Sequence, residues 1–246
     1  MKPDARKLGE EALKEGKNIA SALRDRLGSD RNTPEIIEIA YDLQAGSYIQ
    51  FAEDNSDYVR SYARQLAHHL RRHVKASDVL LDIGAGELTN LSFMIDSLDI
   101  ELGRVIACDI SEPRLQLGRL FAERHMGSNF ARLETLKADI AKIPLGDQSV
   151  DVLTSNHAIE PNGGREEEVL RELLRVSRRK LVLFEPCFEI ASEEAQDRMA
   201  SHAYIRGLGD AAQRAGGILE SMTPLEIVNN PLNPTVCFVI APALPR

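Results

Sequence analysis

The sequence predicts an α/β fold in which a doubly wound, mostly parallel sheet is covered by helices on both faces. From residue 76 onward, short apolar runs alternate with segments of helical periodicity, which is typical of strands joined by crossover helices. Two glycines, Gly84 and Gly86, follow the first apolar run and precede a helical pattern. The length of 246 residues suits one α/β core with a helical appendage, and is too short for two catalytic domains. We therefore expect a helical cap over residues 1–75 and an α/β domain over residues 76–246.

The cap region is expected to hold three helices. Apolar residues at helical spacing predict the first over residues 4–27 and the third over residues 57–75. The second is expected to begin after Thr33, a common N-cap residue, with Pro34 at the first helical position.

Aromatic side chains gather near the end of the second helix. Gly46 interrupts the helical pattern between Tyr41 and Tyr48. A glycine break between tyrosines suits a mobile lid that folds over a ligand. The alternative is that the rings only pack these helices onto the core.

The expected strands of the α/β domain follow one another in a regular order. Five are expected to be parallel, over residues 79–83, 104–109, 133–138, 150–154 and 180–184. Helices are expected over residues 113–121, 165–176 and 192–215. The last two strands, 218–228 and 236–240, are joined by a short loop and are expected to form an antiparallel hairpin.

Composition and charge narrow the functional classes. The formal net charge of -8 disfavours nucleic acid and anionic membrane surfaces as partners. No run approaches the roughly 20 apolar residues of a membrane span. The N-terminal segment lacks an apolar signal core, so we expect a cytoplasmic protein without a membrane anchor. Three cysteines stand singly in apolar runs, which predicts buried free thiols.

The third expected helix carries the most basic face of the chain. Its arginines include Arg60, Arg64, Arg71 and Arg72. A solvated helix face is the simpler interpretation, and docking of RNA or of a protein is the alternative. RNA binding that weakens with added salt would support docking.

Polar residues stand at the ends of the expected parallel strands, the edge at which open α/β sheets bind ligands. The polar residues are Asp82, Asp109, Asp139, Ser155, Asn156, His157 and Glu185, and the glycines Gly84 and Gly86 follow the first strand at the same edge. Glycines let a ligand approach the main chain closely, and the helix that follows directs unpaired N–H groups to the same spot. A carboxylate after the second strand, Asp109, can accept two hydroxyl hydrogen bonds from a ribose. A nucleotide-like ligand is therefore expected.

Three motifs in this order resemble those of the class I S-adenosylmethionine-dependent methyltransferases, in particular the methyltransferase type 11-like family. The motifs are DIGAG at 82–86, CDIS at 108–111 and KADIAKIPLGDQSVDVLTSNHAIE at 137–160. The resemblance covers residues 76–185, and the closing hairpin is similar to the reversed strand of that family. It implies a Rossmann-like sheet of seven strands with one strand reversed, and S-adenosylmethionine as the cofactor.

The resemblance also implies roles for individual residues. The expected cofactor-binding residues are Tyr48, Asp82, Gly84, Gly86, Asp109, Ile110, Asp139, Ile140 and Asn156. Gly84 and Gly86 would hold the methionine part, Asp109 the ribose hydroxyls and Asp139 the adenine amino group. The two isoleucines would contact the adenine faces, and the tyrosine would fold over the cofactor.

One position departs from the family pattern, which usually continues to a third glycine. Leu88 occupies that position here, preceded by Glu87. We expect the leucine side chain either to shift the first turn of the helix or to point into the core. The rival dinucleotide fingerprint would need glycine in place of Thr89, so an NAD-dependent oxidoreductase is disfavoured.

The chemistry implied by the resemblance needs an aligned acceptor and, for a hydroxyl or ammonium, a base. His157 is the expected base, because it follows the fourth strand and its ordinary pKa of about 6.5 suits proton abstraction. The alternative is a histidine that only shapes the pocket. Glu185 is expected to face the pocket, either orienting the acceptor or serving a structural role. No metal site is expected, since His157, Glu160 and Glu185 match a metal-binding set poorly.

The loop at residues 229–235, NNPLNPT, is expected to overlook the acceptor if the strand before it runs parallel to its neighbours. Its prolines fix its shape, and its amides suit a polyhydroxylated small molecule such as a sugar. The alternative is that the asparagines only satisfy turns. We expect a small-molecule substrate. An RNA or protein acceptor, or a non-catalytic cofactor-binding partner subunit, are the alternatives, and the sequence leaves the oligomeric state open.

Overall fold

The computed structural model describes residues 4–243 and contains one seven-stranded sheet with the strand order β3-β2-β1-β4-β5-β7-β6. The strands are β1 (Val79–Ile83), β2 (Arg104–Asp109), β3 (Leu133–Lys137), β4 (Val150–Asn156), β5 (Ser177–Pro186), β6 (Gly217–Pro224) and β7 (Thr235–Pro242). The first five are parallel, whereas β7 is antiparallel to both β5 and β6. The predicted mostly parallel sheet with one reversed strand is confirmed.

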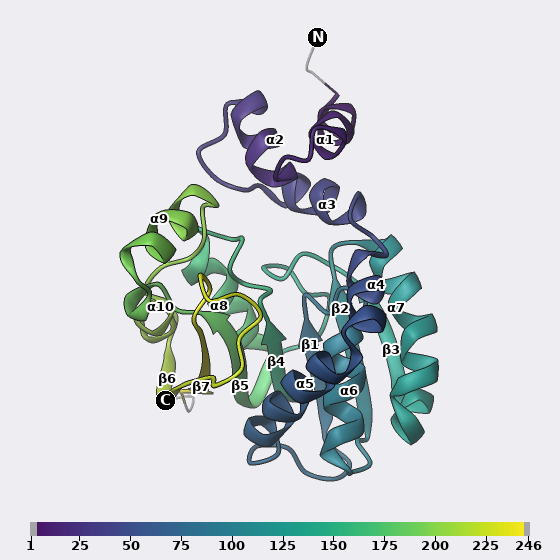
Figure 1. Ribbon diagram of the computed structural model, residues 1–246. Helices are drawn as coiled ribbons and strands as arrows, with labels where there is room; N and C mark the ends of the chain where they lie inside the picture. The colour runs from purple at the N-terminus through teal and green to yellow at the C-terminus, as the bar shows by residue number, and fades with distance from the viewer. Residues whose placement is uncertain (1–3, 244–246) are drawn as a thin grey trace.

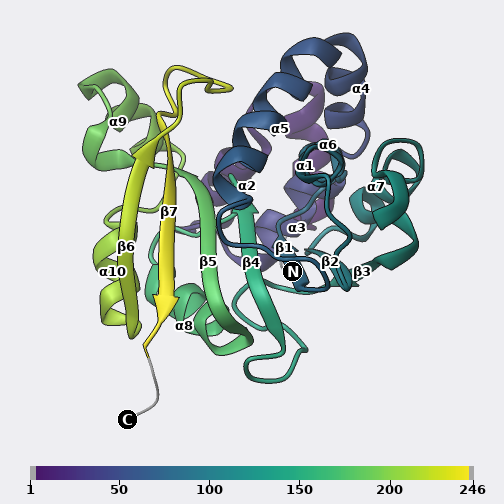
Figure 2. The ribbon, with the colours of Figure 1, turned by 90° about the horizontal axis from the view of Figure 1, so that it is seen from below.

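Helices cover both faces of the sheet (Figures 1 and 2). They are α1 (Ala5–Lys14), α2 (Ile19–Leu27), α3 (Pro34–Asp42), α4 (Ser47–Asp54), α5 (Ser56–Leu70), α6 (Thr89–Leu98), α7 (Glu112–His125), α8 (Glu166–Val176), α9 (Glu193–Ser201) and α10 (Leu208–Arg214). Two 3-10 turns, Gly127–Arg132 and Phe188–Ile190, complete the described elements. Helices α5, α6 and α7 pack on one face and α8 and α10 on the other.

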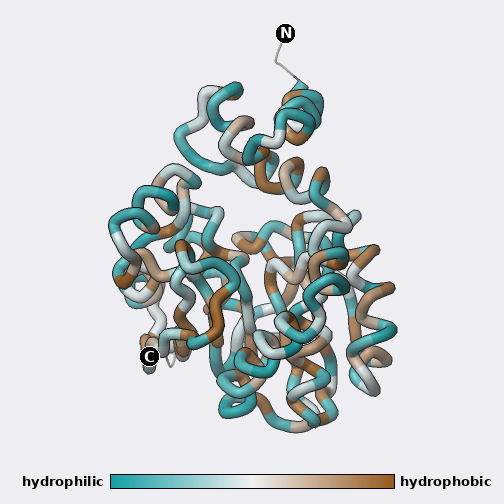
Figure 3. The backbone as a smooth tube through the Cα atoms, in the orientation of Figure 1, coloured by the Kyte–Doolittle hydropathy of each residue, from teal (hydrophilic) through white to brown (hydrophobic). Residues whose placement is uncertain are grey.

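The two apolar cores follow from the alternation of side chains along each strand. In β1, Leu80 packs with α5, α6 and α7, whereas Leu81 packs with α8 and α10. Figure 3 shows hydrophobic and hydrophilic residues alternating along the helices, as expected of helices that turn one face to the core. No helix among residues 4–243 is long and apolar enough to span a membrane. The three cysteines are buried and free, as predicted.

The N-terminal helices lie across the carboxyl edge of the sheet. Helices α1, α2 and α3 share a small apolar core of their own, whose centre includes Leu23 and Ile36. The Oγ1 of Thr33 accepts a hydrogen bond from the Ile36 N–H at 3.3 Å, so the predicted start of the second helix is confirmed. Helix α5 instead belongs to the main core. The division of the chain at residue 75 stays a prediction.

Two expected helices are broken. The segment 4–27 forms α1 and α2, because Gly16 takes a left-handed φ of 66° and Asn18 caps a new helix at the Ser21 N–H. The segment 192–215 forms α9 and α10, separated by residues 202–207. There the Ile205 N–H donates to the Glu160 carbonyl at 3.0 Å, which ties this connection to the loop after β4. The helix expected over 57–75 ends at Leu70.

Candidate active site

A cavity of about 500 Å³ lies where the carboxyl ends of the parallel strands meet α3, α4 and α9. All of the cofactor-binding residues expected from the sequence border it: Tyr48, Asp82, Gly84, Gly86, Asp109, Ile110, Asp139, Ile140 and Asn156. His157 borders it as well, but Glu185 does not. The structure therefore brings together residues that are far apart in the sequence, and leaves one expected catalytic residue outside the lining.

The glycine-rich turn after β1 needs both of its first two glycines. Gly84 and Gly86 have left-handed φ values of 60° and 53°. A Cβ on Gly84 would lie 2.3 Å from the Cβ of Ala158, and a Cβ on Gly86 would lie 2.6 Å from a guanidinium nitrogen of Arg114. The backbone conformation thus disfavours a side chain at both positions, and at Gly84 the Ala158 Cβ leaves no room for one.

Asp109 holds this turn from the end of β2. Its Oδ2 accepts the Gly86 N–H at 2.8 Å and its Oδ1 accepts the Ser111 N–H at 2.8 Å. Burial raises the pKa of Asp109, while Arg114 and the backbone hydrogen bonds act in the opposite direction. Each carboxylate oxygen keeps a second lone pair for a ribose hydroxyl. Burial also raises the pKa of the neighbouring Asp82 well above its ordinary value.

Leu88, at the position of the third family glycine, points into the core. It is fully buried, and it takes a left-handed φ of 55° as the residue before α6. Space for it comes from Gly118 on α7, where a Cβ would lie 2.5 Å from the Leu88 Cδ1 and 2.9 Å from the Glu87 Cα. Of the two expectations for Leu88, burial in the core is the correct one. The residues of the turn just before it, including Gly86 and Glu87, border the cavity.

Glu87 joins the glycine-rich turn to the N-terminal helices. Helix α4 has no side-chain cap at Gly46, but the Glu87 carboxylate accepts the Gly46 N–H at 3.0 Å and the Ile49 N–H at 2.8 Å. The same carboxylate lies 3.4 Å from the Nε of Arg114. The Arg114 guanidinium in turn faces the ring of Tyr48, 4.4 Å from its centroid. A buried carboxylate beside the cofactor motif therefore holds the helix that carries the expected lid tyrosine.

Replacing Glu87 with glutamine is expected to loosen α4 and to weaken cofactor binding roughly tenfold. In the variant, the N–H of either Gly46 or Ile49 faces the glutamine NH₂ group in place of an oxygen, at a cost of about 1–3 kcal/mol. Hydrogen exchange of the peptide covering residues 46–52 should become faster. Glu53→Gln is the matched control, since Glu53 is on the same helix and pairs with Arg124 at the surface. Unchanged exchange in Glu87→Gln would show that α4 does not depend on this carboxylate.

Asp139, which is expected to contact the adenine, is held by a residue that the sequence did not indicate. Its Oδ2 accepts a hydrogen bond from Arg165 at 2.9 Å, and its Oδ1 accepts the Ala141 N–H at 3.1 Å. Arg165 directly precedes α8. Asp139 thus enters the cavity lining with its orientation already fixed.

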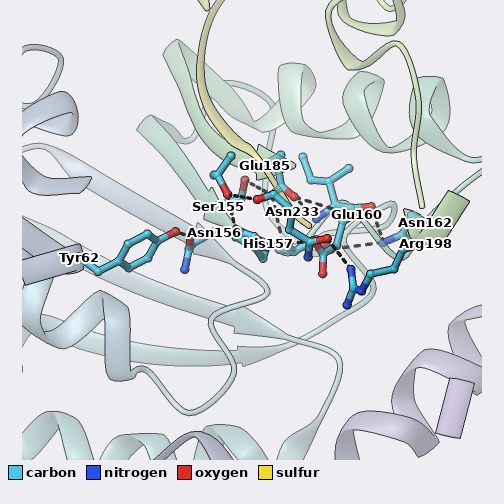
Figure 4. Close-up of polar contacts among 12 residues, drawn as sticks. Tyr62, Ser155, Asn156, His157, Glu160, Asn162, Glu185, Arg198 and Asn233 are labelled. Carbon is cyan, nitrogen blue, oxygen red and sulfur yellow. Dashed lines mark hydrogen bonds and ion pairs between the residues drawn. The ribbon is translucent and has the colours of Figure 1, made fainter. Parts of the chain in front are cut away.

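At the other end, His157 is held by both ring nitrogens (Figure 4). Its Nδ1 lies 3.0 Å from the Glu160 Oε2 and its Nε2 lies 2.9 Å from the Thr235 Oγ1. The Thr235 Oγ1 also lies 3.0 Å from the Asn233 carbonyl oxygen, and when the hydroxyl donates its single proton there, Nε2 is the donor toward Thr235. An ionised Glu160 requires a proton on Nδ1 too. This network describes an imidazolium with no free lone pair toward the cavity.

The electrostatics of His157 agree with this description. Burial lowers the pKa of His157, but the charge and hydrogen bond of Glu160, together with the charge of Glu185, raise it above its ordinary value overall. To act as a base, His157 must first lose a proton and rearrange one of these contacts. Its role as the base stays a prediction.

Replacing Glu160 with glutamine is expected to reverse the direction of the His157 shift, because burial then outweighs the remaining Glu185 charge. Ring-proton NMR titration measures this pKa, with His157→Gln to assign the signal. A raised pKa contributes stability that is fully present below the unfolded value of about 6.5 and lost as the pH rises through the folded pKa. That loss of stability should disappear in Glu160→Gln. An unchanged His157 pKa in the variant would contradict the assigned pair.

The Glu185 side chain does not border the cavity, so the expectation that it faces the pocket is wrong. Its completely buried carboxylate accepts hydrogen bonds from the Ser155 hydroxyl at 2.6 Å and from the N–H groups of Ala158, Ile159 and Glu160 at 3.1, 3.2 and 3.3 Å. Burial raises the pKa of Glu185 to about 7, with the His157 charge opposing. The physical reason is strand alternation, which turns Phe184 toward the cavity and the next side chain under the loop after β4.

The loop after β6 reaches the cavity, as the sequence suggested. Because β6 is antiparallel to the reversed β7, it points in the same direction as β5, and its loop emerges at the carboxyl edge. Asn229, Asn230 and Asn233 border the cavity. Arg198 on α9 and Tyr204 just after it also border the cavity, and the Arg198 guanidinium donates a hydrogen bond to the Asn233 Oδ1. The polar side chains on this side of the cavity therefore include the loop asparagines, one histidine–glutamate pair and an arginine, beside aromatic residues such as Tyr204.

The family comparison agrees with the motifs. Residues 81–184 match the family model described as a methyltransferase domain. Over 104 residues the chain is 33% identical to the ubiquinone/menaquinone biosynthesis C-methyltransferase UbiE of Azotobacter vinelandii, covering 42% of this chain and 39% of that protein. The chain thus matches about two fifths of the length of this curated relative. Within residues 4–243, no group of three or more His, Cys, Asp or Glu side chains is placed to hold a metal ion.

Solved structures show the same fold. The mitomycin 7-O-methyltransferase MmcR aligns with a TM-score of 0.62 at 15% identity, covering 97% of this chain and 67% of its own. The geranyl diphosphate C-methyltransferase from Streptomyces coelicolor A3(2), solved with Mg²⁺, geranyl diphosphate and S-adenosyl-L-homocysteine, aligns with a TM-score of 0.54 at 13% identity, covering 71% and 76%. Residues 81–184 are accordingly a methyltransferase domain, in a chain with the fold of the class I S-adenosylmethionine-dependent methyltransferases.

Proposed function

We propose that this chain transfers a methyl group from S-adenosylmethionine to a small-molecule acceptor, a sugar or another polyhydroxylated metabolite. The observation that carries the proposal is that a single cavity joins the cofactor motifs at one end to an amide-rich surface at the other. Its volume of about 500 Å³ lies in the range of small-molecule sites. The covering helices α3 and α4 favour a small acceptor over a macromolecule.

The residues present fit S-adenosylmethionine. Gly84 and Gly86 border the cavity with main chain that carries no side chain, which the methionine part can approach closely. Asp109 offers two lone pairs to the ribose, and Ile110 and Ile140 border the same cavity near Asp139, as an adenine requires. S-adenosyl-L-homocysteine, the demethylated product, is bound in the Streptomyces coelicolor relative. The cofactor supplies an electrophilic methyl group, so the protein's task is alignment, which can contribute about 7–11 kcal/mol.

Proton removal from a hydroxyl acceptor is assigned to the His157–Glu160 pair rather than to His157 alone. Both His157 nitrogens are already hydrogen-bonded, whereas the Glu160 side chain borders the cavity. The imidazolium holds the Glu160 carboxylate in place, and the carboxylate receives the acceptor's hydrogen bond. A positioned base of this kind contributes roughly 10² to 10⁴ in rate.

The alternatives differ in what they require of the surface. An RNA or protein acceptor would use the basic side of α5, whose arginines do not border the cavity; there Arg60 lies over the Phe93 ring, 4.1 Å from its centroid. A non-catalytic partner subunit would need only the cofactor end of the cavity. The histidine–glutamate pair and the amides at the acceptor end favour catalysis over binding alone.

Transfer of label from methyl-labelled S-adenosylmethionine to a panel of sugars, sugar acids, sugar phosphates and nucleotide sugars tests the proposal. We expect label in at least one member of the panel. Asp109→Ala serves as the inactive control. Label on tRNA or protein and none on metabolites would favour the macromolecular alternative. Cofactor binding with no transfer, even to a whole metabolite extract, would favour the non-catalytic one.

A further inference from the structure

Arg198 places a positive charge at the acceptor end of the cavity (Figure 4). It lies on α9 and is half-buried. One guanidinium nitrogen donates to the Asn233 Oδ1 at 2.5 Å, which fixes the guanidinium from the loop after β6. Among the side chains of residues 4–243, no carboxylate lies within ion-pair distance of Arg198, and its hydrogen-bond partner is a neutral amide. Arginine has five N–H donors, so most of them are left for another group.

Among residues 4–243, the other cationic side chains that border the cavity each lie beside a carboxylate. Arg114, at the cofactor end, pairs with Glu87 at 3.4 Å. His157 pairs with Glu160 at 3.0 Å. Within the described part of the chain, the acceptor end therefore keeps one positive charge, that of Arg198, to which no carboxylate of residues 4–243 is paired. A partly desolvated guanidinium is a strong binder of carboxylate or phosphate, because its planar donors match two oxygens at once.

The surroundings of Arg198 suit a polar acceptor with one charged end. Amides from the loop after β6 border the cavity beside it, and they can read hydroxyl groups without adding charge. The Tyr204 ring centroid lies 6.0 Å from the Arg198 guanidinium carbon and bounds the guanidinium on one side. An anionic group at Arg198 would fix one end of the acceptor and leave the rest of the molecule to extend toward His157 and the cofactor.

We propose that Arg198 binds an anionic oxygen group, a carboxylate or a phosphate, of the methyl acceptor. The acceptor is then an acidic derivative of a polyhydroxylated molecule rather than a neutral one. This inference rests on the proposed methyl transfer, because it assigns the acceptor end of the same cavity. Arg198 acts as a binding and specificity residue.

Calorimetric titration with D-glucuronate, D-glucose 6-phosphate and D-glucose tests the inference on protein loaded with S-adenosylhomocysteine. We expect at least one of the two anions to bind ten or more times more tightly than glucose, and Arg198→Gln to remove that preference. The anion that binds identifies carboxylate or phosphate as the recognised group. Arg206→Gln is the control with the same loss of charge, since Arg206 stacks on Phe188 outside the cavity.

Equal binding of glucose and both anions, absence of binding by both anions, or an unchanged preference in Arg198→Gln would overturn the inference. S-adenosylhomocysteine affinity is measured in the same samples, and the anion titrations are repeated without it. Failure of the unmodified chain to bind S-adenosylhomocysteine contradicts the proposed function. Normal cofactor binding without an anion preference contradicts only the role of Arg198.

Discussion

Replacing Asp109 with alanine is expected to weaken the binding of S-adenosylmethionine and of S-adenosylhomocysteine by about 100-fold or more. In the proposed cofactor complex, the variant loses two charge-assisted hydrogen bonds to the ribose, worth roughly 1.5–3 kcal/mol each. Each 1.4 kcal/mol corresponds to a tenfold change in affinity, so about 3 kcal/mol alone accounts for 100-fold. The Gly86 and Ser111 N–H groups also lose their acceptor, and the glycine-rich turn becomes less fixed. Calorimetric titration with either ligand measures the loss.

Two further variants separate the ribose contacts from the turn. Asp109→Asn keeps one oxygen for the turn and removes the charge, so its affinity should fall between those of the unmodified chain and Asp109→Ala. Asp147→Ala removes an exposed carboxylate that pairs with Arg175 away from the cavity, and should leave affinity unchanged. Affinity in Asp109→Ala within threefold of the unmodified chain would remove Asp109 from the cofactor site.

The core of the sheet could be predicted because its signals are local. The expected bounds of β1 and β2 agree with the structure, since each is a short, largely apolar run with an aspartate next to or at its end, Asp82 before Ile83 in β1 and Asp109 in β2. The residues at these ends border one cavity because parallel strands bring their carboxyl ends to one edge. The loop with Asn230 could be placed by the same argument, once the hairpin was expected.

Long-range contacts decided the features that the sequence did not predict. Nothing local indicates that Glu87 caps a helix about forty residues earlier, or that Gly118 makes room for Leu88. Arg198 lies on a stretch whose helical periodicity predicts one helix through residue 215, so the sequence did not indicate the break that places Tyr204 beside the cavity. The break depends on hydrogen bonds with the loop after β4, which no periodicity records.

Glu185 shows how one step along a strand changes a role. At the end of a strand, a pattern of apolar residues does not say whether the last carboxylate enters the cavity or lies behind the neighbouring loop. In β5 successive side chains point to opposite faces of the sheet, and the Phe184 side chain borders the cavity. Glu185 then meets three backbone N–H groups of the loop after β4. A residue expected at the acceptor instead supports the loop that carries His157.

Replacing Glu185 with leucine is expected to lower the unfolding free energy by about 3–5 kcal/mol and to abolish methyl transfer. The leucine has a similar size, but it leaves the Ser155 hydroxyl and three backbone N–H groups without an acceptor in a place closed to water. At roughly 2–4 °C per kcal/mol for a chain of this size, the melting temperature should fall by about 10 °C. Thermal unfolding followed by circular dichroism measures the change.

The matched control is Glu220→Leu, which removes an exposed glutamate of β6 that pairs with Lys180. It should change stability by well under 1 kcal/mol, because exposed ion pairs contribute little. Glu185→Gln keeps one acceptor oxygen but turns an NH₂ toward donors, so its stability should lie between that of Glu185→Leu and that of the unmodified chain. If Glu185→Leu were as stable as Glu220→Leu, the loop after β4 would not depend on this carboxylate. Other contacts would then have to position His157 and Glu160. The contact between His157 and Thr235 and the burial of Ile159 would account for only part of this positioning.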